Sequence, residues 1–142
     1  MRKLGEIAYV FLFGCFLYSL IEIAARGRTH WSMTLTGGAC LAFIYHITTE
    51  SKMNLFARCF AGTIFITAAE LVVGFFVNII MKWNVWDYSD VPANFLGQIC
   101  LPFSLIWFFL CIIGSGLCRV IEKKFVGVND SDMTAGIAAE SP

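Results

Sequence analysis

The stretch LFARCFAGTIFITAAELVVGFFVNIIM, residues 55–81, decides the fold class of this chain. A helix of that length rises about 40 Å at about 1.5 Å per residue, which exceeds the roughly 30 Å of hydrocarbon in a bilayer. Arg58 and Glu70 are its only charged residues. The stretch therefore predicts a helix that spans a membrane.

The rest of the chain extends this prediction. Of its 142 residues 58% are hydrophobic and 14% are charged, too few charges to cover a water-facing surface. We predict an all-α integral membrane protein, a bundle of four transmembrane helices within residues 1–126. Residues 127–142 are polar and poor in large apolar groups, which predicts a disordered cytoplasmic tail. The other three predicted spans are residues 4–25, 31–48 and 95–118.

Two details inside these spans predict local structure. Thr34, Gly38 and Ala42 form a ladder of small residues, a pattern that lets two membrane helices approach closely. Pro102 lies inside the fourth run and predicts either a kink or an opening of the backbone hydrogen bonds there, because proline removes a backbone donor.

The distribution of basic residues predicts the orientation. With four spans, one side of the membrane holds Arg2, Lys3, Lys52, Arg58, Arg119, Lys123 and Lys124, and the other holds Arg26, Arg28 and Lys82. Cytoplasmic segments carry the excess of lysine and arginine. Both termini are therefore predicted to be cytoplasmic, in a multi-pass protein of the plasma membrane. The formal net charge is zero, which gives nucleic-acid binding no electrostatic support.

Glu70 is the sharpest candidate for function. Placing a charge at the centre of a membrane helix costs about 2.5–3.5 kcal/mol on insertion scales, and such residues usually face the bundle interior. Small and polar residues recur around it at helical spacing, which predicts an inward-facing stripe: Thr63, Thr67, Gly74 and Asn78. Glu70 is either a proton or cation acceptor or ligand anchor, or a protonated residue that holds neighbouring helices together.

Two polar knots are predicted to face the outer side. The first is residues 26–32 with Glu22, which is spaced to pair with Arg26 on one helix face; the second is residues 86–89. Arg26 and Arg28 suit an anionic group of a solute, or equally lipid headgroups. Asn78 and Gln98 either line a pocket or hold helices together. The predicted pocket is lined by Glu22, Arg26, His30, Glu70, Asn78, Asp87 and Gln98.

Trp83, Trp86 and Tyr88 are candidates for a lid over this pocket. Their alternative role is an aromatic belt at the membrane interface.

Metal and enzyme chemistry receive little support. A divalent metal would need Glu22, His30, Glu70 and Asp87 to converge, yet no spacing such as H-x-x-H or H-E-x-x-H occurs. The sequence shows neither a nucleophile–base pair nor a phosphate or dinucleotide loop. We predict no enzyme, no metal and no cofactor.

The motifs together resemble the putative ABC-transporter type IV family of small bacterial membrane proteins. The resemblance covers Tyr18 to Trp107, and it implies the fold and the membrane location. Because the chain lacks a phosphate-binding loop, an ABC role implies a membrane component with a separate partner. The motifs are Arg26-Gly27, His30-Trp31-Ser32-Met33, Gly37-Gly38, Glu70-Leu71 with Gly74 and Asn78, Trp86-Asp87-Tyr88-Ser89, Asn94, and Gly97-Gln98-Ile99-Cys100.

The leading hypothesis is a transport-related membrane protein that binds a small polar or ionic solute in an outward-facing pocket. Four spans make a thin-walled bundle, so we expect a homodimer or a larger transporter partner within the lipid bilayer. Two alternatives remain: a non-transport assembly or sensor subunit, and a metal-dependent membrane enzyme.

Overall fold

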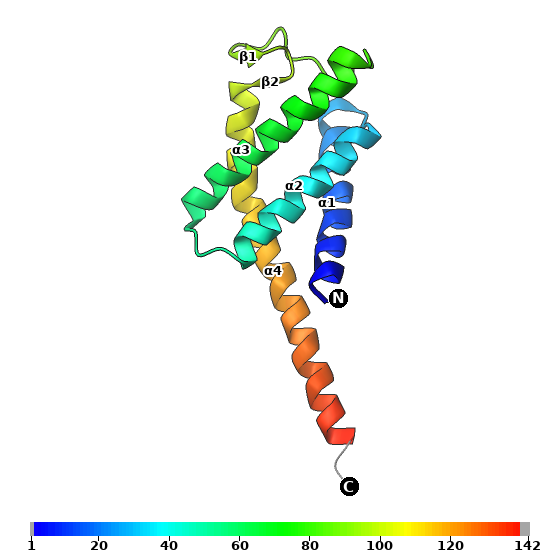
Figure 1. Cartoon of the computed structure of the whole chain (residues 1–142), viewed down its shortest axis with the longest axis vertical. Helices are drawn as coiled ribbons and strands as arrows, with labels where there is room; N and C mark the ends of the chain where they lie inside the picture. Colours follow the sequence, from blue (N-terminus) through cyan, green and yellow to red (C-terminus); the bar gives the residue numbers. More distant parts are fainter. Residues whose placement is uncertain (1, 140–142) are drawn as a thin grey trace.

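Four helices run alternately up and down through the molecule (Figure 1). The computed structural model describes residues 2–139. Its helices are α1 (Arg2–Arg26), α2 (Trp31–Thr49), α3 (Leu55–Gly74), continued by the π-helical turn η1 (Phe75–Ile80), and α4 (Leu101–Ala139). The connections from α1 to α2 and from η1 to α4 lie at one end, and the connection from α2 to α3 lies at the other end (Figure 1).

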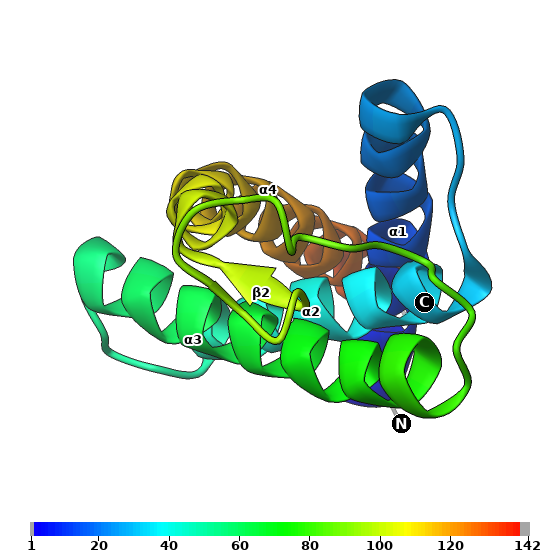
Figure 2. The same cartoon turned by 90° about the horizontal axis from the view of Figure 1, so that it is seen from above.

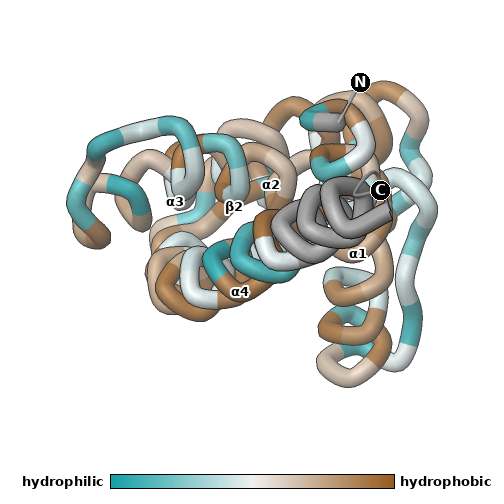
Figure 3. The backbone as a smooth tube through the Cα atoms, turned by 90° about the horizontal axis from the view of Figure 1, so that it is seen from below, coloured by the Kyte–Doolittle hydropathy of each residue, from teal (hydrophilic) through white to brown (hydrophobic). Residues whose placement is uncertain are grey.

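Three helical segments are long and apolar enough to cross a membrane: Lys3–Arg26, Leu55–Ile80 and Leu101–Gly127. The predicted all-helical architecture is therefore confirmed. The connection between α2 and α3 is hydrophilic, whereas the helices are mostly hydrophobic (Figure 3). This pattern is the one expected when the helices face lipid and their ends face water.

The helix α2 occupies the centre of the bundle and differs from the other three. It packs against α1, α3 and α4, and most of its residues are buried (Figure 2). A helix enclosed by protein does not need an apolar surface, which explains why α2 carries Ser32, Thr36 and Thr48. Its first turn is capped by His30, whose Nδ1 accepts from the Ser32 amide at 3.3 Å.

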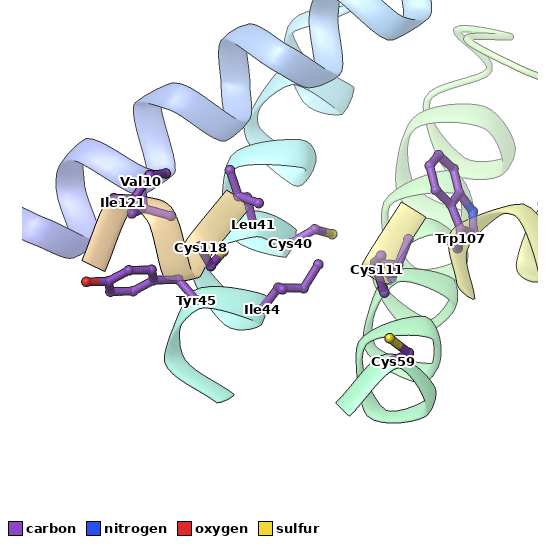
Figure 4. Packing of buried hydrophobic residues seen from close by; sticks show 11 residues of the cluster. Val10, Cys40, Leu41, Ile44, Tyr45, Cys59, Trp107, Cys111, Cys118 and Ile121 are labelled. Carbon is purple, nitrogen blue, oxygen red and sulfur yellow. The ribbon is translucent and has the colours of Figure 1, made fainter. Parts of the chain in front are cut away.

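The hydrophobic core lies between α2, α3 and α4 and reaches α1 at Val10 (Figure 4). It includes Cys40, Cys59, Cys111 and Cys118, which are buried with their thiols free. Their neighbours are apolar side chains such as Ile44. These cysteines thus act as small hydrophobic residues, as their positions in the sequence suggest.

The ends of two predicted spans differ from the structure. The fourth helix begins at Leu101, because residues 94–100 form a hairpin in which β1 (Asn94–Phe95) pairs antiparallel with β2 (Ile99–Cys100). The hairpin turn carries Leu96 and Gly97 at positive φ. Pro102 consequently lies in the first turn of α4, where a missing backbone donor breaks no helical hydrogen bond. The predicted kink at Pro102 is therefore wrong.

The predicted third span is divided into α3 and η1 at Gly74. The backbone of α4 is helical through Ala139, and this helix extends into the segment predicted to be a disordered tail. Residues 140–142 of that predicted tail lie outside the described residues.

The contact between α1 and α2 depends on glycines. A Cβ added to Gly37 would lie 2.2 Å from Cβ of Tyr18, and one added to Gly38 would lie 2.5 Å from Sγ of Cys15. Real Cβ atoms essentially never come this close, so the two backbones can approach only because these side chains are absent. Ser19 of α1 and Thr34 of α2 add a hydroxyl–hydroxyl contact of 2.8 Å.

We expect Gly37→Ala to lower the free energy of unfolding by about 1–3 kcal/mol, the usual cost of overpacking. Tyr18 Cβ is fixed to its backbone and cannot move aside without shifting α1. The measurement is thermal unfolding of the detergent-solubilised protein, followed by its helical circular dichroism.

Gly116→Ala is the matched control for Gly37→Ala, because a Cβ at Gly116 would meet nothing within 4 Å. In a helix this change should be neutral or stabilise by about 0.5–1 kcal/mol. Equal effects of the two substitutions would contradict the packing role assigned to Gly37.

Candidate functional site

The two polar knots lie at the same end of the bundle and are joined directly. The Arg26 guanidinium extends from the end of α1 to the segment that follows η1, where Nη2 donates to the carbonyl oxygen of Val85. Nη1 of the same side chain donates to Oε1 of Glu22 at 2.8 Å. Arg26 therefore bridges the first knot to the chain that leads into the second.

A pocket of about 120 Å³ opens between these segments. Glu22 is 6% exposed, and both of its carboxylate oxygens are engaged. Oε1 accepts from Arg26, and Oε2 accepts from the Thr29 hydroxyl, each at 2.8 Å. The residues that line the pocket are Glu22, Arg26, Arg28, Thr29, His30, Trp83, Asn84 and Val85.

The polar groups still available in this pocket are chiefly basic. Arg28 makes no hydrogen bond or ion pair with the described residues, and it sits in the exposed turn after α1. The ring of His30 lies 5.5 Å from those of Trp31 and Trp83, and its Nδ1 contacts the Ser32 hydroxyl at 2.7 Å. Arg28, His30 and Trp83 all line the pocket, so a ligand would find cationic and aromatic side chains there.

A second polar cluster fixes the segment after η1. Asn78 donates to Oε1 of Gln98 at 2.7 Å and accepts from the Val85 amide at 2.7 Å. Trp86 is 4% exposed, and its Nε1 donates to the Gln98 carbonyl at 2.9 Å. A Cβ at Gly74 would lie 2.5 Å from Oε1 of Gln98, so only glycine leaves room for this cluster. These contacts anchor residues 85–98 on η1.

Glu70 lies apart from both groups, in the middle of the bundle. It is 2% exposed, and its Oε2 accepts from Trp107 Nε1 at 2.9 Å. Its Oε1 has no hydrogen-bond partner among the described residues. Tyr18 stacks on Trp107 with the ring centroids 5.9 Å apart. Burial, and after it the charge of Glu70, raises the pKa of Tyr88 well above its usual range.

Asp87 lies in an exposed turn. It accepts from the amide of Ser89 at 2.9 Å and from its hydroxyl at 2.5 Å, and these hydrogen bonds hold the pKa of Asp87 below its usual value. Its contacts stabilise the turn and leave it outside the pocket. Among the described residues, no group of three or more His, Cys, Asp or Glu side chains could hold a metal ion.

The predicted site residues thus occupy separate places. Glu22, Arg26 and His30 share the outer pocket. Asn78 and Gln98 pair with each other. Glu70 and Asp87 stand alone.

The lid candidates also differ from one another. Trp83 is 47% exposed beside the pocket, Trp86 is buried, and Tyr88 stacks on Phe103 with the ring centroids 4.7 Å apart. Sequence reasoning missed Trp107, the donor to Glu70. Because an indole N–H in an apolar run needs a buried acceptor, Trp107 could have been predicted to donate a hydrogen bond inside the bundle.

Comparison with known proteins gives one match. The model of the putative ABC-transporter type IV family matches residues 9–139, which is most of the chain. No curated protein and no solved structure matches.

We expect Asn78→Ala to loosen residues 82–100, because it leaves Oε1 of Gln98 and the Val85 amide without their partner. Each unsatisfied buried group costs about 1–3 kcal/mol. The measurement is hydrogen exchange of the amides in this segment, which should become faster while exchange in α1 and α2 stays the same.

Asp90→Asn is the control in the same segment, because Asp90 is exposed and makes no polar contact with the described residues. Exchange that is unchanged in Asn78→Ala, or equally fast in Asp90→Asn, would show that Asn78 does not anchor the segment.

Proposed function

The chain belongs to the putative ABC-transporter type IV family, and we propose that it is a transport-related membrane protein that binds a small polar or ionic solute. The outer pocket carries this proposal. It combines a buried carboxylate, a guanidinium that is unpaired among the described residues, and an imidazole at one end of the bundle. Polar groups gathered in this way at a membrane protein's end are suited to receive a solute from water.

The proposed topology has four membrane spans with both termini in the cytoplasm. The alternating direction of the four helices supports it, because α2 then crosses between α1 and α3 (Figure 1). The excess of basic residues at the end that holds the first residues of α1 and the 50–54 connection supports the orientation. In this arrangement the outer pocket opens to the exterior of the plasma membrane.

The charges of the pocket favour an anionic group on the solute. Both oxygens of Glu22 are satisfied by Arg26 and Thr29, so the carboxylate has little left to offer a cation. Arg28 is unpaired among the described residues, and a guanidinium suits planar oxyanions such as carboxylate or phosphate. Trp83 is proposed to cover the bound solute, because its half-exposed ring lies against His30.

Glu70 is proposed to act below the pocket as a proton or cation acceptor. Its burial and its unpartnered Oε1 support this role. The sequence carries no phosphate-binding loop, so we propose that a separate partner would supply any ATP hydrolysis, or that the chain works as a homodimer.

One observation favours a second candidate function. The hydrogen bonds of Asn78 with Gln98 and Val85 are complete, as they would be if polar residues served only to hold helices and loops together. In an assembly or sensor subunit, the polar residues would need only these structural hydrogen bonds and no solute. The unpaired Arg28 and Glu70 Oε1 are the features that this candidate leaves unexplained.

The transport proposal predicts uptake into proteoliposomes that contain the purified full chain. The solutes are labelled acetate, succinate, phosphate and glycine. For a solute taken up above protein-free vesicles, Arg28→Gln should reduce uptake at least about tenfold, since hydrogen bonds to charged groups contribute about 1.5–3 kcal/mol. Lys52→Gln, in the 50–54 connection at the opposite end, should have little effect.

Glu70→Gln tests the deeper role in the same vesicles. Uptake should fall if Glu70 accepts a proton or cation during transport. Unchanged uptake by a folded Glu70→Gln protein would show that this role is wrong. No uptake of any of these solutes would favour the assembly candidate.

The topology proposal predicts opposite labelling at the two ends of the bundle. In intact cells, a membrane-impermeant maleimide should label Asp90→Cys, whereas Lys52→Cys should react only after the membrane is opened. The native cysteines give little background, because five are buried and Cys15 is only partly exposed. Labelling of both positions from the same side would exclude this arrangement of the spans.

A further inference from the structure

A second hollow lies on the side of the bundle, between α1 and α4. It is a groove of about 140 Å³, with α2 as its floor. In Figure 2 the beginning of α4 stands away from α1, and the two helices come closer toward the end of α4. The groove is lined almost entirely by apolar side chains, among them Leu17 and Ile21 of α1, Leu41 and Ile44 of α2, and Leu110 and Leu117 of α4.

Part of the groove wall lies next to Glu70. Tyr18, Cys40, Ile66 and Trp107 line the groove, whereas Glu70 itself does not. Trp107 donates to Oε2 of Glu70, and Ile66 lies one turn before Glu70 on α3. A molecule in the groove therefore lies against the side chain of Trp107, which donates to the Glu70 carboxylate.

One carboxylate oxygen of Glu70 can still accept a hydrogen bond. Its Oε1 is buried without a partner, although nearly all buried polar atoms in folded proteins are hydrogen-bonded. The basic side chain whose charge reaches Glu70 is Arg26, and that guanidinium is already bonded to Glu22 and to the Val85 carbonyl. A buried carboxylate in this state is stabilised by a cation that brings its own hydrogen-bond donor.

We propose that the groove between α1 and α4 binds a small lipophilic ammonium ion, whose charged nitrogen donates to Oε1 of Glu70 and whose apolar body fills the groove. The size fits, since an engineered cavity of about 150 Å³ holds one benzene ring. The indole of Trp107 and the phenol of Tyr18 would shift to admit the nitrogen.

This groove is separate from the outer pocket, with which it shares no lining residue. The inference uses the proposed role of Glu70 as a cation acceptor, but it does not depend on uptake through the outer pocket. Variants of Arg28 test the pocket, and variants of the groove test this site, so the two proposals fail independently.

The test is equilibrium binding of labelled 2-phenylethylammonium to the purified full chain in detergent, with excess unlabelled compound to define background. We expect saturable binding that Glu70→Gln weakens at least about tenfold, given the usual strength of hydrogen bonds to charged groups. The uncharged 2-phenylethanol, which has the same body, should compete at least about tenfold less well.

A matched pair of glycine variants tests the groove itself. Gly114 lines it and would place a new side chain near Ile44, whereas Gly116 on the same helix meets nothing. Gly114→Leu should abolish saturable binding and Gly116→Leu should preserve it. This pair keeps the proposal testable if Glu70→Gln does not fold.

Four results would overturn the proposal. The first three are no saturable binding by the wild-type chain, competition by 2-phenylethanol equal to that by the ammonium ion, and normal binding of the probe by Gly114→Leu. The fourth is a dimer that Gly114→Leu converts to monomer, because the groove would then be filled by a second copy of the chain.

Discussion

The close contact between α1 and α2 sets the positions of the other elements. Gly37 and Gly38 let the two helices approach until the Tyr18 and Cys15 side chains touch the α2 backbone. Because α2 then lies inside the bundle, α3 and α4 pack on its remaining faces. Because lipid offers no hydrogen-bond partners, the polar groups of the bundle depend on partners within this arrangement, and Oε1 of Glu70 lacks one among the described residues.

The outer pocket follows from the same contact. A tight pairing of α1 and α2 leaves only a short turn between them, so Glu22 and Arg26 at the end of α1 lie beside His30 at the start of α2. The chain after η1 closes the third side, where Val85 accepts from Arg26 and Asn78 accepts from the Val85 amide. The π-helical turn that carries Asn78 follows Gly74, where the absence of a side chain admits Gln98.

Much of this architecture could be predicted from the sequence. Apolar runs of sufficient length form helices in a bilayer, and small residues at helical spacing let those helices pack closely. The placement of the two knots at the same end of the bundle also followed from counting spans, but the hydrogen bond from Arg26 to Val85 did not. The hairpin at residues 94–100 did not, because it depends on the positive φ values of Leu96 and Gly97 and on the hydrogen bonds that Asn78 and Trp86 donate to Gln98. The apolar residues there are compatible with either a hairpin or a helix start.

The candidate site could be predicted residue by residue but not as one group. From the sequence, Glu70, Asn78 and Gln98 are expected to need hydrogen-bond partners inside a bundle. The sequence does not identify those partners. Asn78 and Gln98 satisfy each other and the nearby backbone, so their polarity is accounted for by structure. Glu70 accepts one hydrogen bond from Trp107 and has an acceptor left over. If Glu70 served only to hold the bundle together, a glutamine amide at the same position would cost less free energy to bury than the charged carboxylate. The spare oxygen therefore separates Glu70 from the residues whose role ends with packing.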